Sequence, residues 1–273
     1  GNVLSTQRKD ELKSLLQNRN IVSIEPEFVD ATFLYVIPTI TVNYNAGATT
    51  ASAGEINTRV RTAINNFETT ELSIFDKKFR ESTFVRKITE ADVSIVSTLT
   101  TFRMMKRFTP NQGTATTYNF AFNNGIHHPH AGHLGAINST SFTFEGQEAY
   151  LDDDGNANIR IYYLGDNNVR QYLNNTAGTV NYATGLITLD NINITSSSDI
   201  EINAKPAIND LESVRNNIIL ISGTSISVVN DETGAVESRD LNAVTSGSTT
   251  SIDTSYTGTT QTGTTSGVSG TYY

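Results

Sequence analysis

The chain has 273 residues, enough for one large or two ordinary domains with a substantial core. Its formal net charge of −9 disfavours attraction to nucleic acid or to an anionic membrane, so we expect neither partner. It contains no cysteine, which excludes disulfides and thiolate chemistry and fits assembly in a reducing bacterial cytoplasm. Only 17% of the residues are charged, and Thr, Ser, Asn and Gly are abundant, which favours a β-rich protein with a polar surface.

Residues 4–17 predict a helix that would connect the chain to a preceding domain of a longer protein. Three leucines at helical spacing are expected to face inward, while charged residues occupy the other side. These leucines are Leu12, Leu15 and Leu16. Residues 21–24 predict a short strand, which Pro26 separates from the next one.

The segment from Phe28 to Asn45 predicts a long strand, because its second half alternates between apolar and polar residues. Ile40, Val42 and Tyr44 would lie on the buried face. Pro38 stands inside this strand and indicates either a bulge or a sheet edge, since proline has no N–H to donate. An exposed edge is a place where a second chain can add.

A helix with a capping box is predicted next, because Ser52 and Glu55 stand three residues apart before an apolar-periodic run. The apolar face of this helix is expected to consist of Ile56, Val60, Ala63, Ile64 and Phe67. Ser82 is expected to cap a second, short helix, and residues 92–102 predict a return strand. Residues 28–108 would thus form one α+β unit with a helical layer on a small sheet.

After the return strand, the periodicity becomes that of several short strands. Tyr118, Phe120 and Phe122 alternate with polar or small residues, which is typical of a half-buried strand. Further alternating runs are separated by Gly, Asn and Asp, with hairpin turns expected at residues 154–156 and 183–185. These runs predict a small antiparallel sheet or a sandwich, with no helix of note.

Residues 203–240 predict a further piece, in which residues 211–215 form a single helical turn and residues 216–229 a strand or a hairpin. The segment from Thr245 to Tyr273 has Asp253 as its only charged residue. Such a segment cannot bury enough apolar surface to offset an ordering entropy of ~1–2 kcal/mol per residue. We expect it not to fold by itself, and to become extended against a neighbouring subunit in an assembled particle.

All four histidines fall within one short loop, at His127, His128, His130 and His133. Imidazoles at this spacing can ligate a transition metal. However, a proline stiffens the loop, and no carboxylate accompanies the cluster nearby in the sequence. We therefore interpret residues 127–133 as a turn or interface element and predict no native metal there.

The aspartates of residues 152–154, followed by Gly155, superficially match a calcium-binding loop. With Gly155 at the sixth position of such a loop, Tyr150 and Ile161 would occupy the first and twelfth positions, where acids are required. The pattern therefore predicts a type I′ hairpin turn instead of a calcium site.

The sequence contains no nucleophile elbow, no phosphate-binding loop and no zinc-protease motif. Its acidic residues could supply a glycosidase pair, but sugar-cleaving grooves are usually lined with Trp, and this chain has none. Arg103, Lys106 and Arg107 form a basic cluster, interpreted as a solvated strand face that could also pair with an acidic partner. We predict no enzyme activity, catalytic residue, cofactor, metal ligand or small-molecule substrate.

The order of these patterns resembles a known family. The run YVIPTITVNYN, the capped helix and the run ELSIFDKKFRESTFVRKITEADVSIVS are similar to the large baseplate-wedge subunit of contractile-tailed bacteriophages. This subunit is the gene-six product of the T-even type, related to the baseplate J-like proteins. The runs NNGIHHPHAGH, YLDDDGNANIRIYYL and GTVNYATGLITLDN resemble its later β segments. The resemblance covers residues 5–230, and family members are longer, which fits a C-terminal portion of such a protein.

This resemblance implies an α+β fold, in which a small helix-on-sheet module precedes a β-rich antiparallel domain and a polar C-terminal tail. We expect a baseplate J-like module at residues 1–110, a β-rich domain at 111–205, a C-terminal β docking segment at 206–244 and a low-complexity tail at 245–273. The implied role is that of a structural component of the virion, assembled in the host cytoplasm. It would form a homo-oligomer, with a dimer expected, and contact other wedge subunits in the ring around the tail hub.

Two other classes of function stay open. A carbohydrate-binding or adhesin module of a phage or bacterial surface would show a row of aromatic rings in a concave site. A tail-associated hydrolase domain is the third possibility. A wedge subunit would instead present broad, flat contact surfaces.

Overall fold

The computed structural model describes residues 5–17, 27–28, 30–130, 135–196, 198–214 and 216–231. Its helices are α1 (Thr6–Gln17), α2 (Ala53–Phe67) and α3 (Glu81–Thr89), with single turns of 3-10 helix at Ala46–Ala48 and Asp166–Asn168 and of π-helix at Glu68–Leu72. Its strands are β1 (Thr32–Tyr44), β2 (Lys78–Phe79), β3 (Ile95–Phe108), β4 (Ala115–Ala121), β5 (Ile137–Ser139), β6 (Phe142–Phe144), β7 (Gln147–Asp153), β8 (Asn158–Leu164), β9 (Arg170–Asn181), β10 (Leu186–Asn193), β11 (Ile200–Ala204), β12 (Leu211–Glu212), β13 (Asn217–Ile221) and β14 (Ser225–Asn230). The protein is therefore β-rich with a few helices.

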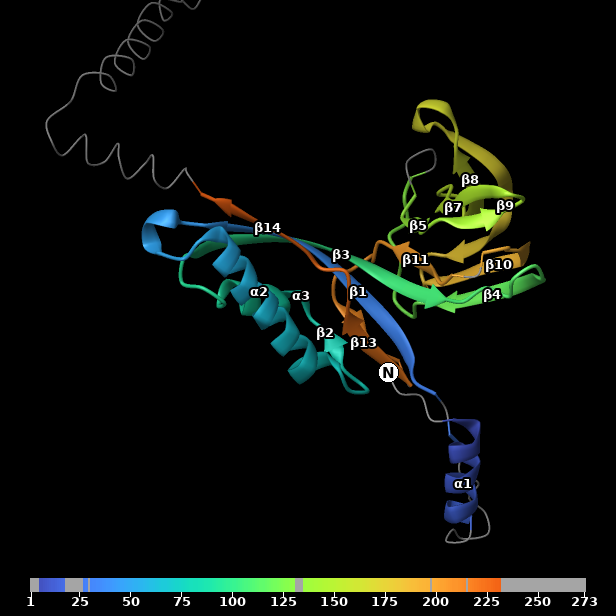
Figure 1. The fold of residues 1–273 in the computed structure, drawn as a ribbon, viewed down its shortest axis with the longest axis horizontal. Helices are drawn as coiled ribbons and strands as arrows, with labels where there is room; N and C mark the ends of the chain where they lie inside the picture. Colours follow the sequence, from blue (N-terminus) through green and yellow to red (C-terminus); the bar gives the residue numbers. More distant parts are fainter. Residues whose placement is uncertain are drawn as a thin grey trace, which may run out of the picture.

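Twelve strands join in one sheet, in the order β13-β1-β3-β11-β5-β7-β8-β9-β10-β4, while β14 also pairs with β1 and β6 with β7. The pairs are antiparallel except those that β13 and β14 make with β1. Figure 1 shows the result as a helix-covered region on one side and a curled all-β region on the other, with the long strands β1 and β3 running between them.

The helix-covered region is built on the alternation of β1. Leu34, Val36, Ile40 and Val42 are buried on one face of this strand, which confirms the predicted pattern. Four phenylalanines from α2, β2, α3 and β3 pack edge-on or tilted on this face, with ring centroids 5.1–6.0 Å apart. These are Phe67, Phe79, Phe84 and Phe102.

Helix α2 begins with the predicted capping box. The Ser52 hydroxyl accepts the Glu55 N–H at 3.3 Å, and the Glu55 carboxylate accepts the Ser52 N–H at 2.7 Å. Behind this cap, Ile56, Val60 and Ile64 are buried against the sheet, as the helical spacing predicts.

The predicted cap of α3 is wrong. The helix begins at Glu81, so Ser82 lies inside its first turn and caps nothing. Instead, the carboxylate of Asp210 accepts the Glu81 N–H at 3.0 Å and binds the Arg80 guanidinium at 2.6 Å. The first turn of α3 is thus capped by a side chain about 130 residues away in the sequence, and not by Ser82.

The return strand begins three residues later than predicted, at Ile95. Asp92 is buried, accepts the N–H and hydroxyl of Ser94 at 2.9 and 2.6 Å, and pairs with Arg59. The hydrogen bond from the Ser94 hydroxyl is the main cause that lowers the pKa of Asp92. The side chain of Asp92 thus bonds the backbone two residues further on and holds a turn, so the strand begins only after it.

Pro38 marks the junction between two strands that run side by side with β1. β13 pairs with Thr32 to Val36, and β14 pairs with Thr39 to Tyr44, so the ladder is interrupted where proline offers no N–H. The hairpin alternative for residues 216–229 is wrong, because both strands run parallel to β1, one after the other. The predicted helical turn at 211–215 is also wrong, because Leu211 and Glu212 pair with β2.

The all-β region follows the predicted short strands. Tyr118, Phe120 and Phe122 share one face of the β4 segment, and Phe108 packs on Tyr118 and Phe120 with ring centroids 4.9 and 4.7 Å away. The runs VRQYL and TVNY form a single strand, β9. Its hairpin with β10 turns at residues 182–185, as predicted.

Helix α1 forms where predicted, but the inward placement of its leucines is wrong. Leu15 and Leu16 are exposed, and the helix stands away from the rest of the chain (Figure 1). It is tied to the body by the Lys9 ammonium, 2.6 Å from the carboxylate of Asp30. The predicted strand at residues 21–24, with Pro26, lies outside the described residues.

The buried position of Ile64 gives a test of the helix-on-sheet packing. Ile64→Asp would place an unpaired carboxylate in this layer and should lower the free energy of unfolding by ~3 kcal/mol or more in urea denaturation. Asn66→Asp, at an exposed position of the same helix, should change it by less than ~0.5 kcal/mol. Equal stability of Ile64→Asp and the parent would refute this packing.

Candidate functional site

Several sheet edges in the described residues lack a strand partner, and three of them belong to the longer strands of the main sheet. β4 pairs only with β10, β13 and β14 pair only with β1, and the first part of β3 pairs only with β1. Their outward backbone N–H and C=O groups can bond another chain, except where side chains already bond them, as Glu68 does the Ile221 N–H and Asn57 the Ile226 carbonyl. The strand residues of β4, β13 and β14 are all uncharged, and so are those of β3 from Ile95 up to Arg103. These edges are the candidate interaction surfaces.

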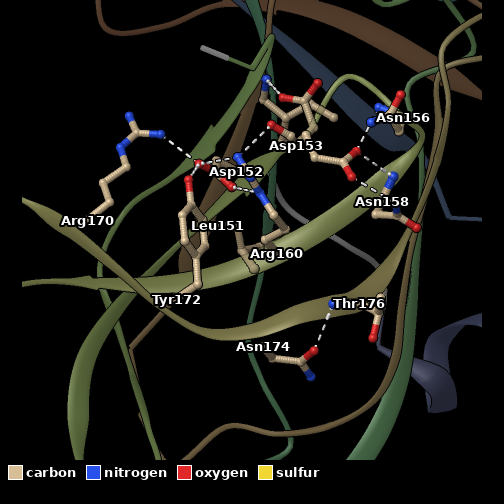
Figure 2. A network of polar contacts seen from close by, with 12 residues as sticks. Leu151, Asp152, Asp153, Asn156, Asn158, Arg160, Arg170, Tyr172, Asn174 and Thr176 are labelled. Atoms are coloured by element: carbon tan, nitrogen blue, oxygen red, sulfur yellow. Dashed lines mark hydrogen bonds and ion pairs between the residues drawn. The ribbon is translucent and has the colours of Figure 1, made fainter. Parts of the chain in front are cut away.

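A buried carboxylate organises the outer part of the all-β region. Asp152 is 2% exposed and accepts a forked pair of bonds from Arg160, at 2.9 and 3.0 Å (Figure 2). Arg170 and the Tyr172 hydroxyl donate to the same carboxylate from β9, at 2.6 and 3.1 Å. One charge thus ties β7, β8 and β9 together, and the forked geometry makes the Arg160 pair strong and specific.

The neighbouring Asp153 is fully buried and bonded within the chain. Its carboxylate accepts the Ile137 N–H at 2.8 Å and the Tyr182 hydroxyl at 2.6 Å. Burial, with the bond to Asp153 second, raises the pKa of Tyr182. A Cβ on Gly135 would lie 1.9 Å from Asp153 Oδ1, so this close approach requires glycine.

Asp154 explains the hairpin that joins β7 to β8. Its carboxylate accepts the backbone N–H groups of Asn156 and Asn158 at 2.7 and 3.1 Å and the Asn158 side-chain amide at 2.8 Å. These bonds close a four-residue loop, so the predicted two-residue type I′ turn is wrong. The aspartates of this run are bonded to groups of the chain itself.

Tyrosine rings line the same strands, which bears on the carbohydrate alternative. Tyr150 stacks on Tyr162 at 5.6 Å, and Tyr172 meets Tyr162 edge-on at 6.0 Å. However, the Arg160 guanidinium lies 4.2 Å over the ring of Tyr172, and that of Arg170 lies 4.5 Å over Tyr162. One face of Tyr162 and one face of Tyr172 are thus each covered by a guanidinium group and closed to a stacking sugar.

Among the described histidines, His128 packs its ring against another part of the chain. The ring of His128 stacks on Tyr182 at 4.3 Å, and its Nε2 lies 3.0 Å from the carbonyl oxygen of Gly155. The backbone N–H of His127 donates to the backbone carbonyl of Lys205. Within the described residues no group of three possible ligands is placed to hold a metal, and His133 lies outside them. The absence of a native metal stays a prediction.

The basic cluster on β3 is divided between two environments. Arg107 pairs with Glu201 at 2.5 Å, so its acidic partner is in the same chain. Lys106 is half-buried beside a cleft of about 850 Å³ that β1, β3 and β4 line, and burial lowers its pKa to about 8. The interpretation as a solvated strand face is therefore wrong for Lys106. The local sequence carries no sign of this burial, since Lys106 stands between Met105 and Arg107.

The comparisons with known proteins identify the helix-covered region. Residues 32–107 match the family described as baseplate structural protein gp6, C-terminal domain III. The baseplate wedge protein gp6 of Enterobacteria phage T4 is 22% identical over 106 residues, which is 39% of this chain and 16% of that protein. The chain carries a domain of the gp6-like baseplate wedge family.

The expected resemblance is therefore confirmed, and with it the assignment to the structural proteins of the virion, in the tail baseplate. The gp6-like domain begins and ends with β1 and β3, and it includes α2 and α3 between them. The resemblance of the later β segments stays a prediction. None of the described helices is both long and apolar enough to cross a membrane.

The Asp152 network predicts a large effect of one conservative substitution. Asp152→Asn would leave two guanidinium groups without their shared counter-charge and should lower the free energy of unfolding by ~2–4 kcal/mol. The exposed Asp190→Asn change is the control and should cost less than ~0.5 kcal/mol. Matching urea midpoints for the two variants would show that the network contributes nothing.

The lowered pKa of Lys106 predicts a pH-dependent stability. Between pH 8 and ~10.4 the unfolded chain binds more protons than the folded one, so the free energy of unfolding of the parent rises with pH through this window. Lys106→Met should therefore be more stable than the parent at pH 7, by a margin that shrinks from pH 8 to 10. The control is Lys205→Met at an exposed position, for which the difference in free energy of unfolding from the parent should not depend on pH. If this difference were also constant with pH for Lys106→Met, the burial of Lys106 would be contradicted.

Proposed function

We propose that the chain is a structural component of a phage tail baseplate wedge that self-associates and contacts other wedge subunits in the ring around the tail hub. The gp6-like domain at residues 32–107 is the observation that carries this proposal. The chain spans only 16% of the T4 relative, so the partners of the whole protein are part of the proposal.

The surface of the described residues supports a role in assembly. Sheet edges in both regions are open and uncharged, and large apolar side chains are exposed near the β3 edge. Val93 is 97% exposed and Leu99 67% exposed. Isolated exposed apolar residues are common, but next to an open strand edge they suit burial against another chain.

The fold that accompanies this function is the α+β arrangement expected from the sequence. We propose a helix-on-sheet module, a β-rich antiparallel domain and a polar tail, divided at residues 110, 205 and 244. Strands from the third part lie along β1 of the first, which ties the parts through the sheet.

The chain is proposed not to be an enzyme, since its family consists of structural proteins. The carbohydrate-binding alternative is the weaker one, because guanidinium groups cover two of the three clustered tyrosines. A direct comparison is titration with host-surface glycans, for which the proposal expects no saturable binding.

Self-association is tested by size-exclusion chromatography with light scattering over about 1–100 µM chain. We expect the mass of a dimer to appear as concentration rises, because the interface would consist of paired strand edges. Since the edges are uncharged, the dimer should persist in 1 M salt, which screens surface ion pairs. A monomer mass at all these concentrations would refute self-association of the isolated chain.

A further inference from the structure

The first part of β3 has an open edge beside helix α3. β1 pairs with β3 from Ile95 to Met105, whereas β11 joins the other side only from Met104 onward. No described strand therefore lies beside residues 95–103 on that side. In Figure 1 this part of β3 runs above α3, away from the all-β region.

The register shows which β1 groups face which neighbour. The carbonyls of Val36 and Tyr44 accept the N–H groups of Ser222 and Asp231, at 3.0 and 2.8 Å. Even-numbered residues of β1 thus direct their backbone groups toward β13 and β14, and odd-numbered ones toward β3. In antiparallel pairs the residues opposite one another bond each other in alternation.

On β3, Leu99 and Thr101 lie opposite odd-numbered residues of β1 and bond that strand. It follows that Thr98, Thr100 and Phe102 direct their N–H and C=O groups toward the open edge. The edge is thus a regular row of donors and acceptors, spaced to bond an added strand.

The helical layer extends beyond the strands that it covers. Two helices packed side by side span ~20 Å, whereas three strand positions, β13 or β14 with β1 and β3, span ~14 Å. The difference is about one strand. A groove of about 600 Å³ lies where this strand would be, lined by Glu81, Ser82, Val85 and Arg86 of α3 and by residues 98–100 of β3.

The chemistry of this edge is that of a covered strand. Residues 95–102 contain no charge and no proline, the features with which soluble proteins protect an exposed edge. Val96 and Leu99 are exposed there. Direct pairing of β3 with β3 of another copy is disfavoured, because two α3 helices would compete for a gap one strand wide.

We propose that this groove accepts, as one added strand, a segment from residues 245–273 of a second copy of the chain. This inference rests on the proposed self-association. It specifies which segment of one copy adds as a strand and which groove of the other copy receives it. Residues 245–273 lie outside the described residues, and their sequence matches the groove: neutral except for Asp253, rich in Thr and Ser, and free of proline.

The described part of the chain ends on the other side of β1 from the groove. Asp231 bonds Tyr44 on the β14 side of β1, whereas the acceptor groove lies on the β3 side. The residues from Asp231 to Thr245 can span up to ~45 Å, which reaches a neighbouring copy and also the groove of the same chain, two strand positions away, so the oligomeric state of the full chain decides between these sources.

The test uses a fluorescent peptide of residues 245–273 and the chain truncated after Val244. Anisotropy should show saturable binding to the truncated chain. Thr100→Pro removes an N–H from the open edge and should weaken binding at least tenfold, while Thr100→Val keeps that N–H and should bind as the parent does. Ser82→Trp, at an exposed position of α3, should also abolish binding by filling the groove.

Circular dichroism melting checks that each variant is folded. If Thr100→Pro is unfolded, the binding of the peptide to Ser82→Trp is the deciding measurement. No binding up to about 1 mM peptide, or equal binding by the parent and Ser82→Trp, would overturn the proposal. If the full chain stays monomeric while the peptide binds, the second copy as the source is refuted. A dimer that survives truncation without peptide binding would refute this inference and leave the proposed self-association standing.

Discussion

The structure depends on the use of β1 along both of its edges. One edge pairs with β3 over almost its whole length, and the other is divided between β13 and β14 at Pro38. Its buried face carries the helical layer. A strand used in this way fixes the register of every neighbour, because a shift by one residue would turn its apolar side chains to the solvent.

The hydrophobic pattern sets which faces are buried, and polar contacts fix how several of the turns and strands are placed. Asp210 bonds the first turn of α3, and Asp92 holds the turn before β3. Asp152 does the same for three strands of the all-β region. Asp92 and Asp152 are buried, and the several donors that each of them accepts offset the cost of burial, whereas Asp210 is partly exposed. These contacts make the scaffold specific in its geometry.

A rigid sheet with open, uncharged edges suits an assembly protein. Its backbone groups can bond another chain without demanding a particular side-chain sequence, while the neighbouring apolar residues limit access by water. The aspartates of residues 152–154 are bonded to groups of the chain itself.

The sequence by itself determined the elements whose signals are local. The capping box at Ser52, the buried face of α2, the alternation of β1 and most short strands depend on neighbours within a few residues, and all are in the structure. The order of these elements also sufficed to identify the family. Tertiary structure alone decided the start of α3, the parallel placement of β13 and β14 and the burial of Lys106. These features depend on contacts between segments far apart in the chain, and periodicity carries no information about which distant segments meet.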